Sequence, residues 1–111
     1  MGMDLKPINP DKHAPKSEWS GDYEWGRYNW TGWTWLIDLL AKYGWTNDDL
    51  KEFAGTNDGY VISDETCKKV AKTLREHRVT IGDKAKRDLL ESDWVDHQIL
   101  LWETCGGYEQ W

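Results

Sequence analysis

The chain of 111 residues fits a single domain with a modest hydrophobic core, and its formal net charge is −6. This acidic balance argues against generic nucleic-acid binding through phosphates, which needs clustered Lys and Arg side chains. We recognise no signal peptide and no apolar run long enough for a membrane span. We therefore expect a cytoplasmic protein without membrane contact, whose two cysteines stay reduced.

The first 16 residues differ in composition from the rest of the chain. They contain all three prolines, Pro7, Pro10 and Pro15, with Asp and Lys residues between them. Such a segment is typical of an extended and mobile terminus. The sequence therefore predicts a flexible arm over residues 1–16, followed by one compact, aromatic-rich domain over residues 17–111.

The stretch from Trp19 to Trp45 holds six of the nine tryptophans and three of the five tyrosines. Before Asn29 no regular period persists, and we expect an aromatic loop laid over the core. From Thr31 to Tyr43 the apolar residues recur at helical spacing, which predicts a helix that ends at Gly44. Trp33 and Leu36 belong to the stripe that this helix buries.

Four further segments follow in chain order. Thr46 to Asp49 reads as a capping run that opens a short helix to Phe53, and residues 60–62 read as a short extended piece. Ser63 caps a predicted helix that ends near His77, and a last helix is predicted over residues 84–104. The predicted fold is therefore mainly α. It is a small single domain of three main helices plus a short helix and an aromatic N-terminal loop, with little or no sheet.

One helix carries a run of basic side chains, and we interpret it as a solvated helix face rather than an anion-binding surface. The run consists of Lys68, Lys69, Lys72, Arg75 and Arg78.

Three separated patterns resemble a known family. They are the aromatic block Tyr28 to Leu36, the turn Asn57-Asp58-Gly59, and the end Cys105-Gly106-Gly107-Tyr108. In this order and spacing they resemble a family of small bacterial and phage proteins of uncharacterised function, with the pattern Y-x-N-x-W-x-W, N-D-G and C-G-G-F/Y. The resemblance covers residues 27–108. It implies no activity, but it implies that the aromatic block and the two glycine turns converge on one surface.

The aromatic loop and the glycine turns supply the candidate site. Tryptophan and tyrosine rings offer flat faces for stacking, and a guanidinium among them can bind a phosphate or carboxylate. The alternative is that these rings are core and that the glycines only end helices and form turns. The candidate ligand- or partner-binding residues are Trp19, Tyr23, Trp25, Arg27, Tyr28, Asn57, Asp58, Gly59, Gly106 and Gly107.

The leading functional hypothesis is a non-enzymatic binding protein. It would be a phage or bacterial inhibitor or immunity-type protein that binds a host or defence protein through an acidic aromatic surface. A first alternative is a protein that sequesters a small nucleotide-like or anionic ligand. A second alternative is a small hydrolase that uses Asp93 with His97, four residues apart on a helix, or Cys105. No metal-ligand spacing is present, so we expect neither a metal nor a cofactor.

Overall fold

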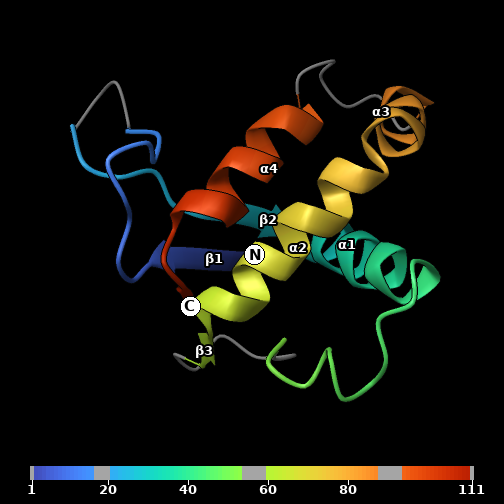
Figure 1. Cartoon of the computed structure of the whole chain (residues 1–111), viewed down its shortest axis with the longest axis horizontal. Helices are drawn as coiled ribbons and strands as arrows, with labels where there is room; N and C mark the ends of the chain where they lie inside the picture. The colour runs from blue at the N-terminus through green and yellow to red at the C-terminus, as the bar shows by residue number, and fades with distance from the viewer. Residues whose placement is uncertain (1, 17–20, 54–59, 88–93, 111) are drawn as a thin grey trace.

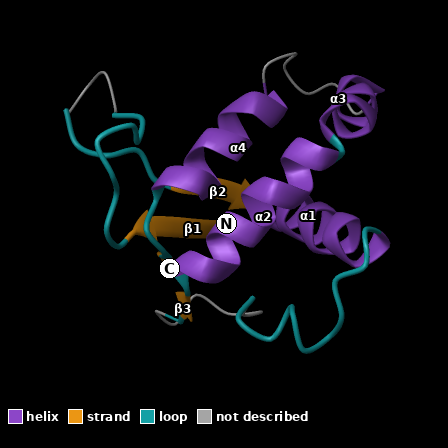
Figure 2. Cartoon of the chain, viewed as in Figure 1, coloured by secondary structure: helices purple, strands orange, loops and turns teal. Residues whose placement is uncertain are grey.

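The structure is a computed structural model, and it describes residues 2–16, 21–53, 60–87 and 94–110. Its strands are β1 (Gly2–Pro7), β2 (Gly26–Asn29), β3 (Val61–Ile62) and β4 (Tyr108–Gln110). Its helices are α1 (Trp30–Lys42), α2 (Asp64–Glu76), α3 (Arg78–Arg87) and α4 (Trp94–Thr104). The strands form one antiparallel sheet in the order β2-β1-β4-β3, and α2 and α4 lie side by side across it (Figures 1 and 2).

The prediction of a mainly α fold with little or no sheet, and with it the all-α class, is wrong, because the protein is a small mixed α/β domain. The hydrophobic pattern of the sequence did not predict these strands, and the reason is physical. They are two to six residues long, so a period of two has no room to show. Their partners are also far away in the chain, since Leu5 pairs with Gln110.

The N-terminal segment corrects a second expectation. Residues 2–7 are not a flexible arm, because β1 lies between β2 and β4 in the sheet. Met3 and Leu5 are fully buried, and Asp4 between them points the other way, as alternation along a strand requires. Pro7 closes the strand, where a missing N–H costs little.

Residues 8–11 continue from β1 and lie across the turn between α4 and β4; we call them the N-terminal strap. Three of their backbone N–H groups donate to backbone carbonyls of that turn. The bonds run from Ile8 to Gly107 at 3.0 Å, from Asn9 to Cys105 at 3.1 Å and from Asp11 to Thr104 at 3.0 Å. The strap therefore ties the first strand to the end of α4.

One face of the sheet is buried under the helices. Its buried side chains are Met3, Leu5, Tyr28, Ile62, Tyr108 and Gln110. The alternate residues Arg27 and Val61 are exposed on the opposite face. One face of the sheet thus packs against the helices, and the opposite face carries mostly polar residues.

The two helices with the clearest sequence signals are confirmed. α1 begins after Asn29, whose side-chain Oδ1 accepts a hydrogen bond from the Gly32 backbone N–H at 2.6 Å. α2 begins after Ser63, whose Oγ accepts from the Thr66 N–H at 3.2 Å. Both are side-chain N-caps that satisfy an otherwise unpaired donor in the first turn.

The remaining helix predictions are wrong in their bounds. Residues 47–52 form hydrogen-bonded turns rather than a short helix. The predicted helix over residues 84–104 is described instead as α3 and α4, and residues 88–93 between them lie outside the described part of the chain. Residues 79–82, which lie between the two predicted helices, belong to α3; Ile81 is fully buried there, and tertiary packing overrides a weak propensity. Among the described residues, no helix combines the length and apolarity that a membrane crossing requires.

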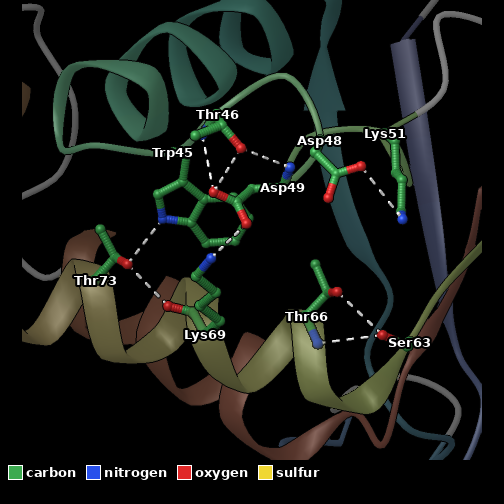
Figure 3. A network of polar contacts seen from close by, with 9 residues as sticks. All are labelled: Trp45, Thr46, Asp48, Asp49, Lys51, Ser63, Thr66, Lys69 and Thr73. Atoms are coloured by element: carbon green, nitrogen blue, oxygen red, sulfur yellow. Dashed lines mark hydrogen bonds and ion pairs between the residues drawn. The ribbon is translucent and has the colours of Figure 1, made fainter.

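The turn segment after α1 is fastened to α2 by the contacts in Figure 3. The Trp45 Nε1 donates to the Thr73 Oγ1 at 3.1 Å, and the Lys69 ammonium lies 4.6 Å from the Trp45 ring centroid. The Asp49 carboxylate accepts from the Thr46 backbone N–H at 2.9 Å and from the Lys69 Nζ at 2.9 Å. Asp49 and Thr46 cap each other, as in a capping box, and Lys69 joins that cap to α2.

These contacts predict a pH dependence. The bonds from Thr46 and Lys69 lower the pKa of Asp49 to about 2, so ionised Asp49 stabilises the fold. The contribution is present above the unfolded pKa of about 4 and is lost as the pH falls through about 2. The Asp49→Asn variant should be less stable than wild type at pH 7, and urea midpoints should converge near pH 2. Asp48→Asn is the control. It removes only an exposed ion pair with Lys51, so its stability should match that of wild type at every pH.

Candidate functional site

A pocket of about 580 Å³ lies beside the first turn of α1, and we call it the α1 pocket. Its lining residues come from β2, from the start of α1 and from the start of α4. They are Arg27, Tyr28, Asn29, Thr31, Gly32, Trp35 and Trp94. The volume falls within the range of about 300–1,000 Å³ that small-molecule sites occupy. The consecutive elements β2 and α1 thus meet α4, which is distant in sequence, around one concave surface.

Two half-buried indoles form the apolar wall of the α1 pocket. The rings of Trp35 and Trp94 meet edge to face, with centroids 5.3 Å apart and planes at 74°. This arrangement is the favoured one for an aromatic pair, and it holds both rings in place. A flat ring that enters the pocket can stack on an indole held in this way.

The polar wall is positively charged. The Arg27 side chain is 72% exposed, and its Nη1 lies 3.7 Å from an Asp4 Oδ1 across the sheet. A pair this long and this exposed is weak, so the guanidinium can exchange Asp4 for another anion. The first turn of α1 contains no acidic residue, and its N-terminal end adds a partial positive charge to the same wall.

Tyr28 lines the pocket, and its hydroxyl belongs to a buried hydrogen-bond chain. Its hydroxyl accepts from the Trp102 Nε1 at 3.0 Å and donates to the Gln98 side-chain carbonyl oxygen. Burial raises the pKa of Tyr28 well above its usual range, so the hydroxyl stays protonated and can donate. Tyr28 was predicted as a contact residue, yet it is 7% exposed and belongs largely to the core.

We expect Tyr28→Phe to lower the free energy of unfolding by about 1–3 kcal/mol. The variant keeps the ring but leaves the Trp102 Nε1 and the Gln98 oxygen buried without this partner. Urea denaturation measures the loss. Tyr60→Phe, at a tyrosine that is 57% exposed, is the matched control and should leave the stability unchanged. Equal stability of both variants would contradict the importance of the buried chain.

Of the other predicted residues, those that the structure describes do not line the α1 pocket. Trp19, Asn57, Asp58 and Gly59 lie outside the described residues. Tyr23 and Trp25 are half-buried but do not line the pocket, and the Lys16 ammonium lies 5.0 Å from the Tyr23 ring centroid.

The C-terminal glycine turn packs against the strap instead of the pocket. Gly106 and Gly107 both have positive φ angles, of 67° and 107°. A Cβ on Gly106 would lie 2.0 Å from the Asn9 carbonyl oxygen, so the strap backbone occupies the space that a side chain would need. The turn therefore serves close chain packing in the described structure, and the convergence of both glycine turns with the aromatic block is not what we observe for Gly106 and Gly107.

The sequence prediction missed the two indoles of the α1 pocket. Trp35 sits on the flank of the α1 stripe, and that off-stripe position was the available signal. Trp94 gave no local signal, because only the packing of α4 against the rest of the domain brings it to Trp35. Asn29, the N-cap of α1, and Gly32, whose backbone N–H it binds, line the pocket as well.

The basic run on α2 and α3 is neutralised by carboxylates. Its five ion pairs are Lys68 with Asp64 at 2.5 Å, Lys69 with Asp49 at 2.9 Å, Lys72 with Glu76 at 4.0 Å, Arg75 with Glu103 at 2.6 Å, and Arg78 with Asp96. The two guanidiniums lower the pKa values of Glu103 and Asp96. The interpretation of this run as a solvated helix face agrees with these pairs.

The groups proposed for hydrolysis are differently arranged. The His97 Nε2 lies 3.0 Å from a Glu24 carboxylate oxygen, so its observed partner comes from the N-terminal loop. Asp93 lies outside the described residues. Cys105 is 2% exposed beneath the strap, which leaves almost no surface for a substrate to approach. Within the described parts of the chain, no group of three or more His, Cys, Asp or Glu side chains is placed to hold a metal ion.

No protein-family model, curated protein sequence or solved structure matches this chain. The resemblance drawn from the three motifs therefore stays a prediction, and the argument for function rests on the α1 pocket.

Proposed function

We propose that this protein binds a small planar anion in the α1 pocket and does not convert it chemically. The observation that carries the proposal is that one loosely paired guanidinium and two indoles line the same pocket. A guanidinium binds a carboxylate or phosphate through two parallel hydrogen bonds, and an indole stacks on an aromatic ring. A nucleotide or an aromatic carboxylate offers both groups in one molecule.

The test is a titration followed by tryptophan fluorescence and melting temperature. The probes are nucleoside monophosphates and aromatic carboxylates, each beside its neutral nucleoside or amide. We expect an anion to shift the fluorescence and raise the melting temperature, and its neutral counterpart to bind at least tenfold more weakly, because a charge-assisted hydrogen bond contributes about 1.5–3 kcal/mol. If the whole panel leaves both signals unchanged, small-anion binding is refuted.

Three variants separate the pocket from the rest of the surface. Arg27→Gln should weaken anion binding about tenfold or more and remove the preference for the charged probe. Asp4→Asn is its matched control, because it breaks the same ion pair but keeps the guanidinium, and it should bind as well as wild type or better. Trp94→Leu should weaken every aromatic probe about tenfold, since stacking on one ring contributes about 1–3 kcal/mol. Equal losses in Arg27→Gln and Asp4→Asn would contradict a direct contact with Arg27.

A second proposal is an inhibitor- or immunity-type protein that binds a basic protein partner. It is supported by the net charge of −6 and by Trp30, which is 37% exposed at the start of α1. Opposite net charges speed association, and exposed tryptophans serve as interface anchors. Trp30→Ala should abolish capture of such a partner from a host lysate, whereas Trp25→Ala, at a half-buried ring, should reduce it less. Unchanged capture by Trp30→Ala would count against this surface.

For either binding function we place the protein in the cytoplasm. The support is the pair of free, buried cysteines, since a reducing compartment keeps thiols unpaired.

A further inference from the structure

The lining of the α1 pocket is divided into a polar part and an aromatic part. Arg27 and Asn29 alternate along β2 and are both exposed, and Thr31 follows in the first turn of α1. The indoles come from the second turn of α1, which holds Trp35, and from the start of α4, which holds Trp94. Thr31 and Trp35 are four residues apart, which is about 6 Å along a helix axis. A ligand that contacts both parts must therefore keep its charged group and its ring apart.

The polar part offers more hydrogen-bond donors than a carboxylate can use. The Arg27 guanidinium presents two parallel N–H groups, which alone occupy both oxygens of a carboxylate. The Asn29 Oδ1 accepts from the Gly32 N–H, so its amide NH₂ is the group that it offers to a ligand, and the Thr31 hydroxyl adds a third donor. A phosphate monoester has three terminal oxygens and a charge of about −1.5 to −2 at neutral pH, so it can accept from all three side chains.

The charge and the size of the pocket suit a ligand with a single phosphate. Of the described residues that line it, Arg27 alone is charged, and the whole chain has a net charge of −6. A second or third phosphate would meet no further cation among these residues and would be repelled by the acidic chain. The volume of about 580 Å³ lies in the range that holds drug-sized ligands, so it leaves room for a base and a sugar beside the phosphate.

We propose that the planar anion of the α1 pocket is a nucleoside monophosphate, an inference that rests on the small-anion binding proposed above. The phosphate binds to Arg27, Asn29 and Thr31, and the base stacks on the indoles of Trp35 and Trp94. The sugar spans the turn of helix between them. An aromatic carboxylate such as benzoate has its charge joined directly to the ring, so it reaches only one part of the pocket. Because every base has a face that can stack, we expect little preference for one base.

The test is isothermal titration calorimetry of the full chain with matched ligands. Adenosine monophosphate is compared with adenosine carboxylate, which keeps the sugar but lacks the phosphate, and with phenyl phosphate, which keeps the phosphate but lacks the sugar. Its methyl ester, which lacks one terminal oxygen, completes the set. We expect adenosine monophosphate to bind about tenfold or more tightly than each of the other three, because each loses at least one charge-assisted hydrogen bond or the stacked base. Uridine monophosphate should bind within about tenfold of it, and adenosine triphosphate should bind more weakly.

A threonine pair tests the phosphate contact at the start of α1. Thr31→Val removes the hydroxyl but keeps the size and the branching of the side chain. It should weaken adenosine monophosphate about tenfold and leave adenosine carboxylate unchanged, because the two carboxylate oxygens are already bound by Arg27. Thr34→Val is the matched control, at an exposed threonine of the same helix that does not line the pocket, and it should bind every ligand as wild type does.

The failure of this inference can be told from the failure of small-anion binding. If neither these ligands nor benzoate binds, small-anion binding is refuted and the nucleotide assignment with it. If adenosine carboxylate, phenyl phosphate or benzoate binds as tightly as adenosine monophosphate, the pocket binds planar anions but the assigned ligand class is wrong. Tighter binding of adenosine triphosphate would overturn the assignment to a monophosphate. Unchanged affinity of Thr31→Val for adenosine monophosphate would overturn the arrangement of the phosphate at α1.

Discussion

Leu5→Ala is expected to lower the free energy of unfolding by about 2–5 kcal/mol, a large share of what a domain of this size possesses. Leu5 is fully exposed to solvent in an unfolded arm but 0% exposed in the fold. It lies in the central part of the sheet, paired with Gly26 on β2 and with Gln110 on β4. Deleting three carbons there leaves a cavity between the sheet and the helices. Urea denaturation followed by tryptophan fluorescence measures the loss.

The neighbouring residue supplies the control. Asp4 lies on the same strand but on the opposite face, with its side chain 47% exposed. Asp4→Ala removes a long ion pair with Arg27, and its effect on the free energy of unfolding should stay within about 0.5 kcal/mol. A mobile N-terminal arm would make both substitutions neutral. Similar stabilities of Leu5→Ala and Asp4→Ala would therefore contradict the placement of β1.

Gly106→Ala is expected to cost at least about 3 kcal/mol of stability. The positive φ of 67° alone costs an L-residue about 1–2 kcal/mol. In addition, the new Cβ would lie 2.0 Å from the Asn9 carbonyl oxygen and 2.6 Å from its carbon, which are backbone atoms and cannot turn away. The strap must move, and its hydrogen bonds to the turn are then lost, at about 1 kcal/mol each.

Gly44→Ala separates the two causes. Gly44 also has a positive φ, of 97°, but nothing lies within 4 Å of the position of its missing Cβ. Its substitution should therefore cost only the conformational part, about 1–2 kcal/mol. The difference between the two variants, read from urea midpoints, measures the contact between the strap and the turn. If both variants lose the same stability, that contact contributes nothing.

Local signals in the sequence identified the helices that have complete caps. Asn29 and Ser63 each precede an apolar period of 3.6 residues, and the bounds of α1 and α2 followed from them. The strands lacked such signals. In β1 the alternation of Met3, Asp4 and Leu5 spans too few residues to outweigh the nearby prolines. Strand pairing depends on the tertiary fold here, because β1 and β4 lie at opposite ends of the chain and form hydrogen bonds with each other only after folding.

The candidate site was predictable to the same extent. Arg27 stood out as a cation among aromatic residues and Tyr28 as one of those rings, and both line the α1 pocket. Their true surroundings were not predictable, because Trp94 reaches the pocket from a helix more than sixty residues away in the chain. Tyr28 shows why aromatic residues are hard to assign from sequence. A tyrosine in a buried hydrogen-bond chain and a tyrosine that binds a ligand have the same sequence signal.

The pairing of β1 with β4 has a kinetic consequence. One edge of β1 forms its hydrogen bonds only with β4, where Leu5 pairs with Gln110. Nearly the whole described chain must therefore be synthesised before that edge is paired. Until then the edge of β1 that pairs with β4, over Leu5, Lys6 and Pro7, has no neighbouring strand. Contacts of such long sequence separation slow folding and prolong the time in which nascent chains can associate. The net negative charge makes copies of the chain repel one another. We expect this repulsion to reduce association most while β1 is not yet paired with β4.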